Sequence, residues 1–233
     1  MFEINVASLQ IQIDNRFDEI SRLCHSYRVD NGQSDFAVSV SETALEHERN
    51  VAGEGFSDGY LETLGVYRAI GERLPHYDAF IFHSAVIEAD GFAYAFAAKS
   101  GTGKSTHIRH WKKALGERVN IVNGDKPIFR FIDGKLYACG TPWAGKEGWQ
   151  RNVIVPLAGI CCLERGDRNT ITPIKSIEAL PKVLSQIYLP AEQASAEKTF
   201  RLLDRMLTEI PLWRLSCTDD IQAAYVAANE ILK

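Results

Sequence analysis

The chain has 233 residues, of which 45% are hydrophobic and 24% are charged. This composition is typical of a globular protein, so it excludes disordered, collagen-like and low-complexity chains, and the length is sufficient to bury a sizeable core. The 30 acidic side chains outnumber the 26 basic ones, and the formal charge of −4 argues against a general binder of nucleic acid or of anionic membranes.

The cysteines and the first residues indicate a reducing compartment. The number of cysteines is odd and no C-x-x-C spacing occurs, so free thiols are expected and a disulfide framework is not. The N-terminus lacks the basic segment and apolar block of a signal peptide, and no apolar run approaches the ~18 residues that a membrane span needs. We therefore expect a cytoplasmic protein with no membrane partner and no nucleic-acid partner. The cysteines are Cys24, Cys139, Cys161, Cys162 and Cys217.

The first 75 residues predict a small α+β unit, because segments with alternating apolar residues are interleaved with segments of helical spacing. Asp58 can cap the last helix of this unit, and Pro75 ends it because proline lacks the amide hydrogen that a continuing helix needs. In chain order, the expected elements are a strand at 2–13, a helix at 17–27, a strand at 36–40, a short helix opened by Ser41 and Glu42, a loop at 52–59 and a helix at 58–74.

From residue 78 onward the sequence is typical of an α/β core. Apolar runs at 79–89 and 92–98 are joined by Asp90-Gly91, which is a strong signal for a two-residue hairpin. We expect an N-terminal unit at 1–75 and a core at 76–233. The later elements are a helix that stops at Gly116, a strand at 119–122, a hairpin of 128–132 with 135–139, a buried strand at 153–163 interrupted by Pro156, a mostly helical tail from Ser176, a strand at 212–217 and a last helix from Thr218 or Asp219.

Residues 100–106, Ser-Gly-Thr-Gly-Lys-Ser-Thr, are the most informative segment. Glycines permit the backbone to turn successive amides toward phosphate oxygens, and the helix start that follows adds a favourable dipole. Lys104 would contact the β- and γ-phosphates, and the Ser105 hydroxyl would hold Mg²⁺. The loop consensus has a glycine where this chain has Ala98, and the alternative is a glycine turn with a solvated Lys104. The expected ATP-binding residues are Ser100, Gly101, Thr102, Gly103, Lys104, Ser105 and Thr106.

Asp125 supplies the expected acid, 21 positions after Lys104 and at the end of an apolar strand. One helix and one returning strand fit this spacing, which would place the carboxylate beside the phosphates. There it could hold Mg²⁺ through water or accept a proton from an attacking hydroxyl. No N-K-x-D motif follows, so a guanine-specific GTPase is not indicated. The alternative is that Asp125 is a turn residue in Asn-Gly-Asp.

The order of these motifs resembles the catalytic domain of the HPr kinase/phosphorylase family. The resemblance rests on HSAVIEADGFAYAFAAKSGTGKST at 83–106 and NGDKP at 123–127, and it covers residues 76–165. The same residues resemble kinases that phosphorylate lasso-peptide precursors on serine, and the phosphate loop of ATP-dependent phosphoenolpyruvate carboxykinase. This resemblance implies an α/β fold with a mixed sheet around a phosphate loop (P-loop).

The resemblance also implies roles for single residues. Lys104 and the loop would bind ATP, while Ser105 and Asp125 would hold the metal. Asp125 would also be the catalytic base, and His83 matches the strand histidine near that base; a core histidine is the alternative. Lys126 stands where the family has a second acid, which puts the reverse, phosphorylase reaction in doubt.

A glycine- and tryptophan-containing segment at 140–152 stands where the family has E-x-R-G-x-G. Arg151 or Lys146 could clamp phosphate there and Glu147 could reach the metal, with a solvated surface loop as the alternative. The glycines and tryptophans predict a mobile lid that folds over bound nucleotide or acceptor.

Together the motifs predict an ATP-dependent kinase that transfers the γ-phosphoryl group to a hydroxyl, with Asp125, Lys104 and His83 as its catalytic residues and with ATP and Mg²⁺ as its cofactors. The acceptor is a serine of a peptide or protein, or a small hydroxyl compound, and the resemblance suggests a homo-oligomer. Two alternatives stay open. One is a non-catalytic ATP-binding sensor or partner module, which Lys126 favours, and the other is a carboxykinase-like enzyme.

Overall fold

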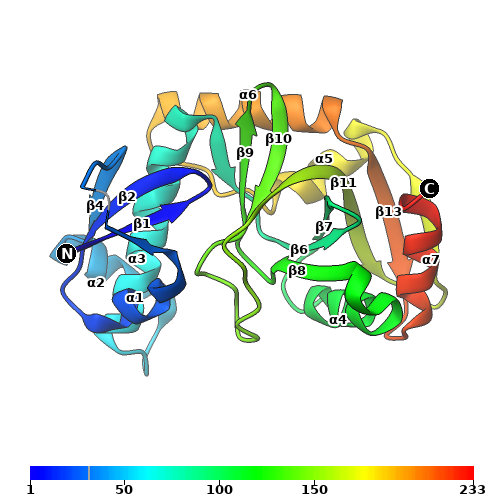
Figure 1. Cartoon of the computed structure of the whole chain (residues 1–233), viewed down its shortest axis with the longest axis horizontal. Helices are drawn as coiled ribbons and strands as arrows, with labels where there is room; N and C mark the ends of the chain where they lie inside the picture. Colours follow the sequence, from blue (N-terminus) through cyan, green and yellow to red (C-terminus); the bar gives the residue numbers. More distant parts are fainter. Residues whose placement is uncertain (31) are drawn as a thin grey trace.

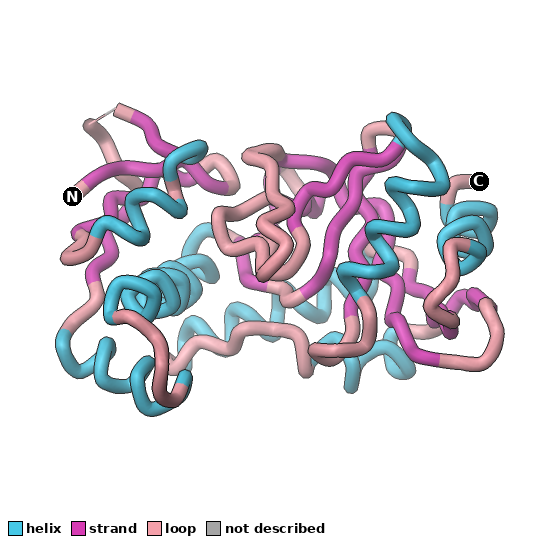
Figure 2. The backbone as a smooth tube through the Cα atoms, turned by 90° about the horizontal axis from the view of Figure 1, so that it is seen from below, coloured by secondary structure: helices cyan, strands magenta, loops and turns pink. Residues whose placement is uncertain are grey.

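The structure is a computed structural model that describes residues 1–30 and 32–233. The described residues form a four-stranded sheet in the order β3-β1-β2-β4 and a nine-stranded mixed sheet whose main path is β5-β9-β10-β11-β7-β6-β8. The two chain ends lie at opposite ends of the molecule (Figures 1 and 2). No described helix combines the length and apolar character that crossing a membrane requires.

The N-terminal part corrects one predicted strand. Residues 2–13 form the hairpin β1-β2, because Ala7 and Ser8 adopt the left-handed φ values of 56° and 57° between the strands. Ser57, and not Asp58, caps α3 by accepting a hydrogen bond from the amide of Tyr60. The elements are β1 Phe2–Val6, β2 Leu9–Asp14, α1 Asp18–Leu23, β3 Arg28–Val29, β4 Phe36–Ser39, α2 Glu42–Ala52 and α3 Asp58–Arg73.

The larger sheet contains both predicted Asp-Gly hairpins. Asp90-Gly91 turns β6 into β7 and Asp133-Gly134 turns β9 into β10, with φ between 47° and 85° at all four residues. The elements are β5 Ala79–Ile81, β6 Ser84–Ala89, β7 Phe92–Ala97, α4 Lys104–Leu115, β8 Val119–Asn123, β9 Ile128–Ile132, β10 Lys135–Cys139, β11 Ile154–Arg165, β12 Thr170–Pro173, α5 Ser176–Leu184, α6 Gln193–Glu209, β13 Leu212–Cys217 and α7 Gln222–Ile231.

Three sequence predictions about the core are wrong in detail. The run 79–89 forms two strands, β5 and β6. Pro156 lies inside β11 and does not interrupt it. Proline has no amide hydrogen to donate, and Pro156 stands next to an irregularity in the pairing of β11 with β7, between Leu157 and Gly159. The last helix begins at Gln222, because Asn169 accepts hydrogen bonds from the amide and hydroxyl of Thr218 and holds that residue outside the helix.

Helices cover both faces of the larger sheet, and strand alternation decides which side chains they meet. On β7, Ala93, Ala95 and Ala97 belong to the core that contains α5 and α6, whereas Tyr94 and Phe96 belong to the core that contains α4 and α7. Figure 1 shows α6 on one side of the sheet and α4 on the other. The result is a three-layer α/β/α arrangement around the strands that lead into residues 98–103.

A third apolar cluster joins the N-terminal sheet and helices to the larger sheet. Ile81, Ile128 and Cys139 of the larger sheet pack in the same cluster as side chains of β1, β2 and α3. Trp143 also belongs to it, and its indole donates a 2.9 Å hydrogen bond to the Thr63 carbonyl on α3. This cluster contains residues from both sides of position 75. The division into two domains at residue 75 therefore stays a prediction.

All five cysteines are buried and free, as the sequence predicts. Burial raises the pKa of the Cys24 and Cys139 thiols to about 12 and also raises that of Cys161. A thiol whose pKa is raised in this way stays protonated at neutral pH, and thus makes a poor nucleophile.

Candidate active site

One edge of the larger sheet brings the predicted phosphate loop and the predicted acid together. Strands β7 and β8 are both antiparallel to β6, which lies between them, so both end at the same edge. At that edge Ser84 pairs with Ala97, and its amide donates to the carbonyl of Asp125 at 3.1 Å. Two strand spacings of ~4.8 Å therefore separate the start of the loop from the segment that carries Asp125.

The loop 98–103 connects β7 to the start of α4. Gly101 and Gly103 have φ values of 78° and 114°, which side-chain-bearing residues rarely adopt, so these two glycines are required by the turn. No side chain caps α4 at Gly103. The first amides of a helix without such a cap have no intrahelical partner, and their role in binding phosphate stays a prediction.

Lys104 lies across this loop and is not solvated. Its side chain is only 7% exposed, and Nζ donates a 2.8 Å hydrogen bond to the Ala98 carbonyl. Burial lowers the pKa of Lys104, and the charge of Asp125 acts in the opposite direction. The alternative of a solvated lysine on an exposed helix is therefore wrong, and the ammonium keeps further donors for a phosphate beside the loop.

Asp125 is held by two basic side chains. His83 Nε2 lies 2.7 Å from Oδ1, and Lys126 Nζ lies 3.4 Å from Oδ2. Burial raises the pKa of this carboxyl, but the hydrogen bond with His83 and the charges of Lys126 and His83 outweigh burial and hold the pKa below its usual range. The site thus contains an ionised carboxylate, and His83 is its hydrogen-bond partner and not an isolated core histidine.

Asn123, which the sequence analysis did not single out, makes the turn that precedes this carboxylate. Its Oδ1 accepts hydrogen bonds from the amides of Asp125 and Lys126, at 2.9 and 2.7 Å. Its Nδ2 donates to the Thr141 carbonyl at 3.0 Å. Asn123 therefore takes the turn role that was the alternative for Asp125, and the Asp125 side chain is left for the site.

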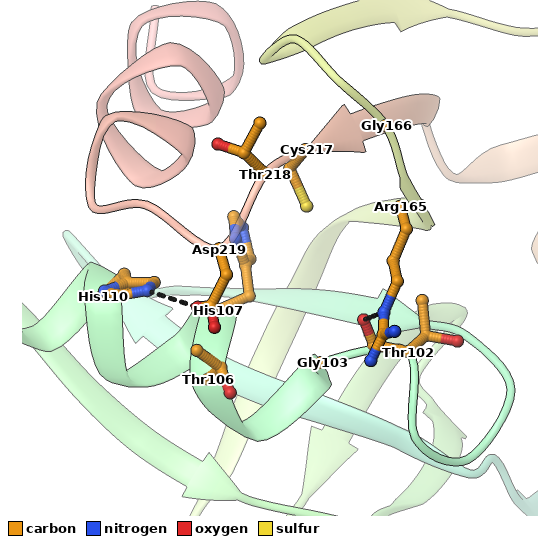
Figure 3. A pocket seen from close by; sticks show the side chains of 10 residues that line it. All are labelled: Thr102, Gly103, Thr106, His107, His110, Arg165, Gly166, Cys217, Thr218 and Asp219. Carbon is orange, nitrogen blue, oxygen red and sulfur yellow. Dashed lines mark hydrogen bonds and ion pairs between the residues drawn. The ribbon is translucent and has the colours of Figure 1, made fainter.

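Cavities lie on both sides of the loop. The first, of about 340 Å³, is lined by Thr102 and by Thr106, His107 and His110 of α4, and Figure 3 shows Arg165 and Asp219 bounding it from other segments. The second, of about 790 Å³, lies between the loop and the end of α5. Arg165 borders both and donates a 2.7 Å hydrogen bond to the Gly101 carbonyl. Nothing local in the sequence marks Arg165, which lies more than 60 positions from the loop.

Arg151 is the predicted nucleotide contact that the structure does not bring to the loop. Its guanidinium donates to Glu88 at 2.8 Å. Glu88 pairs with Ala93, near the end of β7 that lies away from the loop. The backbone amide of Arg151 is bonded to the Val122 carbonyl, and this pairing fixes the direction of its side chain. Arg151 is therefore a loop residue that forms an ion pair with Glu88 of β6.

The segment 140–152 is mostly packed and not a freely moving lid. Residues 141–144 are buried, and a Cβ at Gly140 would lie 1.8 Å from the Arg151 carbonyl oxygen. Residues 145–148 form an exposed tip, Arg151 and Asn152 are exposed at the end of the segment, and Glu147 in the tip pairs with Arg109 of α4 at 3.6 Å. A Cβ at Gly145 would lie 3.1 Å from that of Asp125, so the exposed tip begins directly against the carboxylate. Any closure is confined to that tip.

The described residues contain no cluster of three or more His, Cys, Asp or Glu side chains that could cage a metal ion. Magnesium does not need such a cage, because it keeps several waters and binds through one or two protein oxygens together with substrate phosphates. Ser105 in the first turn of α4 and the ionised Asp125 fit that donor set. Their roles as metal ligands remain predictions.

A prediction about acid stability arises from His107, which is buried below the loop. Its Nε2 accepts a 2.9 Å hydrogen bond from the Trp111 indole, and burial lowers the pKa of His107 to about 3. The unfolded chain takes up this proton near pH 6.5 and the folded chain does not, so His107 reduces stability as the pH falls from about 6.5 toward 3, by up to ~1.4 kcal/mol per pH unit.

Urea unfolding at several pH values in this range checks the prediction. His107→Gln is expected to lose that share of the pH dependence, while His47→Gln, at an exposed position of α2, serves as the matched control. Equal slopes for the wild type and His107→Gln would contradict the assignment.

No model of a known protein family matches the chain, and no curated protein matches it. A solved structure to which the chain is similar is the HPr(Ser) kinase/phosphatase from Coxiella burnetii, with 9% sequence identity and a TM-score of 0.39. The similarity covers 65% of this chain and 90% of that chain. It is a distant similarity of fold.

Proposed function

We propose that the protein is an ATP-dependent kinase that transfers the γ-phosphoryl group of ATP to a hydroxyl acceptor. The observation that carries this proposal is the meeting of a buried phosphate-loop lysine, Lys104, with an ionised carboxylate, Asp125, at one edge of the sheet. A cation for the phosphates and a base for the acceptor are the two charged groups that this reaction needs from the protein.

In the proposed complex, the phosphates lie on backbone amides of the loop and of the first turn of α4, and the nucleoside occupies the 340 Å³ cavity beside α4. When bound, Mg²⁺ neutralises charge on the β- and γ-phosphate oxygens, and Ser105 and Asp125 are the residues that would hold it. Lys104 stabilises the negative charge that develops on the transferred group.

Asp125 acts on the acceptor. As the acceptor oxygen forms its bond to the γ-phosphorus, the bond to the β-phosphate bridging oxygen breaks, the hydroxyl proton moves to Asp125 and ADP leaves. His83 positions the carboxylate through the 2.7 Å hydrogen bond to Oδ1, which leaves Oδ2 toward Lys126. His83 is itself fixed, because its amide donates to the Gln186 carbonyl at 2.8 Å.

One observation favours a second candidate, an ATP-binding sensor without turnover. Lys126 lies 3.4 Å from the same carboxylate oxygen that would receive the proton or the metal. A lysine in this position reduces the basicity of the carboxylate and competes with a cation. The sensor therefore predicts saturable ATP binding with no ADP formed. The oligomeric state and the identity of the acceptor stay predictions under either candidate.

The decisive experiment follows ATP, ADP and any new phosphoester by phosphorus NMR after mixing the protein with ATP, Mg²⁺ and a panel of hydroxyl compounds and serine peptides. We expect ADP and a phosphoester in equal amounts, and loss of both when the metal is chelated. Ser105→Ala should slow the reaction, because it removes the metal-binding hydroxyl, whereas Thr208→Ala, at an exposed position of α6, should not. ATP binding without ADP formation across the panel would overturn the kinase in favour of the sensor.

A further inference from the structure

A third cavity, of about 290 Å³, lies between α3 and the Asp125 side of the site. Leu64, Tyr67 and Arg68 of α3 form one wall, and His83 and Lys126 form the opposite one. Ser185 and Gln186 line both this cavity and the 790 Å³ cavity along the phosphate loop. The third cavity is therefore the space from which a second substrate would reach the Asp125–His83 pair.

The charged groups of this cavity favour an anion. Arg68, Lys126 and His83 line it, and none of the lining residues is a carboxylate. The counter-charges lie outside the lining: Glu48, 2% exposed, pairs with Arg68 through Nε, and Asp125 pairs with Lys126. Nε is the Arg68 nitrogen nearest to Glu48, and among the described residues no hydrogen bond uses the terminal guanidinium nitrogens. These nitrogens can bind a carboxylate with two parallel hydrogen bonds.

An unpartnered polar group in the same lining points to a ligand with donors. Gln186 is 5% exposed, and its buried Oε1 has no hydrogen-bond partner among the described residues. Its Nε2 donates to the Ser185 hydroxyl at 2.8 Å, so Oε1 is the free end. A buried acceptor without a partner is costly, and a donor from a bound molecule would remove that cost.

The cavity is too small to hold a folded protein. A volume of about 290 Å³ is at the small end of ligand pockets. Tyr67 of α3 and Tyr188 both line it, and their ring centroids lie 6.5 Å apart. The cavity thus suits a compact molecule that combines an anion with donor groups.

We propose, resting on the kinase function above, that this cavity binds the phosphoryl acceptor and that the acceptor is a small hydroxy acid with a second donor group. Arg68 and Lys126 hold its carboxylate, one donor fills Gln186 Oε1, and the reacting hydroxyl lies against Asp125. The hydroxyl oxygen forms the new bond to the γ-phosphorus of ATP, the bond to the β-phosphate oxygen breaks, and the hydroxyl proton passes to Asp125.

The test uses glycerate as the probe, with two matched compounds. Glycerol keeps the hydroxyls but lacks the carboxylate, and lactate keeps the carboxylate but lacks the second hydroxyl. With Mg²⁺ and ATP, we expect kcat/KM to fall at least ~10-fold from glycerate to glycerol, because a charge-assisted pair is lost, and to a smaller extent from glycerate to lactate. A blocked serine peptide amide, which carries no carboxylate, is the fourth acceptor.

The variants test the same wall. Arg68→Gln is expected to raise KM for glycerate at least ~10-fold with the ATP dissociation constant unchanged. Arg73→Gln, on the same helix but outside the cavity lining, is the matched control. Because Arg68→Gln alone leaves buried Glu48 without its partner, the double variant Glu48→Gln with Arg68→Gln removes both charges at nearly constant shape, and it should raise KM equally.

The possible outcomes distinguish a wrong acceptor assignment from a wrong reaction. Transfer to glycerol or to the blocked peptide as fast as to glycerate, or an unchanged KM in the double variant, would overturn the hydroxy-acid assignment and leave the kinase standing. If no acceptor is phosphorylated, the NMR signals of the His83 imidazole are followed as glycerate or glycerol is added. A shift with glycerate but not with glycerol supports the cavity as an anion site and overturns the kinase. The absence of any shift overturns the anion site and the kinase together.

Discussion

Asp125→Asn is expected to fold and to bind ATP at saturating Mg²⁺, but to transfer phosphate at least ~10²-fold more slowly than the wild type. Asparagine keeps the shape of the side chain, so its oxygen can still accept the hydrogen bond from His83. It cannot take a proton from the acceptor hydroxyl, and general-base catalysis typically contributes ~10²–10⁴-fold in rate. Turnover measured across a magnesium titration separates the loss of a base from the loss of a metal ligand.

The control for this variant is Asp133→Asn, at the turn between β9 and β10, where φ is 47° and asparagine is equally tolerated. It should leave turnover unchanged. Wild-type turnover in Asp125→Asn would reduce Asp125 to a structural residue beside Asn123. Full activity restored by additional Mg²⁺ would assign Asp125 to metal binding alone.

Lys104→Ala is expected to weaken ATP binding by at least ~10-fold. The ammonium is the buried cation of the loop, and charge-assisted hydrogen bonds contribute roughly 1.5–3 kcal/mol each, where 1.4 kcal/mol corresponds to a factor of ten in affinity. The variant also leaves the Ala98 carbonyl without its 2.8 Å partner, so the folded state is verified by thermal unfolding. Isothermal titration calorimetry with ATP and Mg²⁺ measures the effect.

Lys113→Ala provides the comparison, because Lys113 is exposed on the same helix α4 and carries the same charge. Its affinity for ATP should match that of the wild type. If Lys104→Ala and Lys113→Ala have the same affinity for ATP, any loss relative to the wild type reflects the change in net charge and not the loop position of Lys104. Residues 98–104 are then only a helix-initiating turn.

Local sequence patterns correctly predict those features of the fold that depend on local conformational preferences. The Asp-Gly hairpins and the strand, loop and helix around Lys104 depend on φ preferences and apolar spacing within a few residues, and the structure contains all of them. The turn at Ala7 and Ser8 escaped prediction because neither residue type favours positive φ, so tertiary packing of β1 on β2 decides it.

The lining of the candidate site is less accessible to sequence reasoning. Arg68 lies about a hundred positions before Arg165 and Gln186 in the chain, and no motif connects the three residues. Arg151 shows the opposite error. Its spacing from the loop suggested a phosphate clamp, but backbone pairing at Val122 turns its side chain toward Glu88. Spacing along the chain does not report the direction in which a side chain points.

The hydrogen bond from the Trp143 indole to the Thr63 carbonyl has a consequence for how such a chain can change during evolution. The acceptor is a backbone atom, so every residue type at position 63 supplies it, whereas only tryptophan brings this donor and this ring at position 143. Substitutions at Leu64, Tyr67 and Arg68, three residues that line the proposed acceptor cavity, therefore leave this hydrogen bond to the segment that ends against Asp125 in place, and they change the side-chain packing on Trp143, such as the ring contact of Tyr67. Under the proposed function, substitutions in α3 can change the substrate specificity while the residues at the sheet edge that would carry the chemistry stay the same.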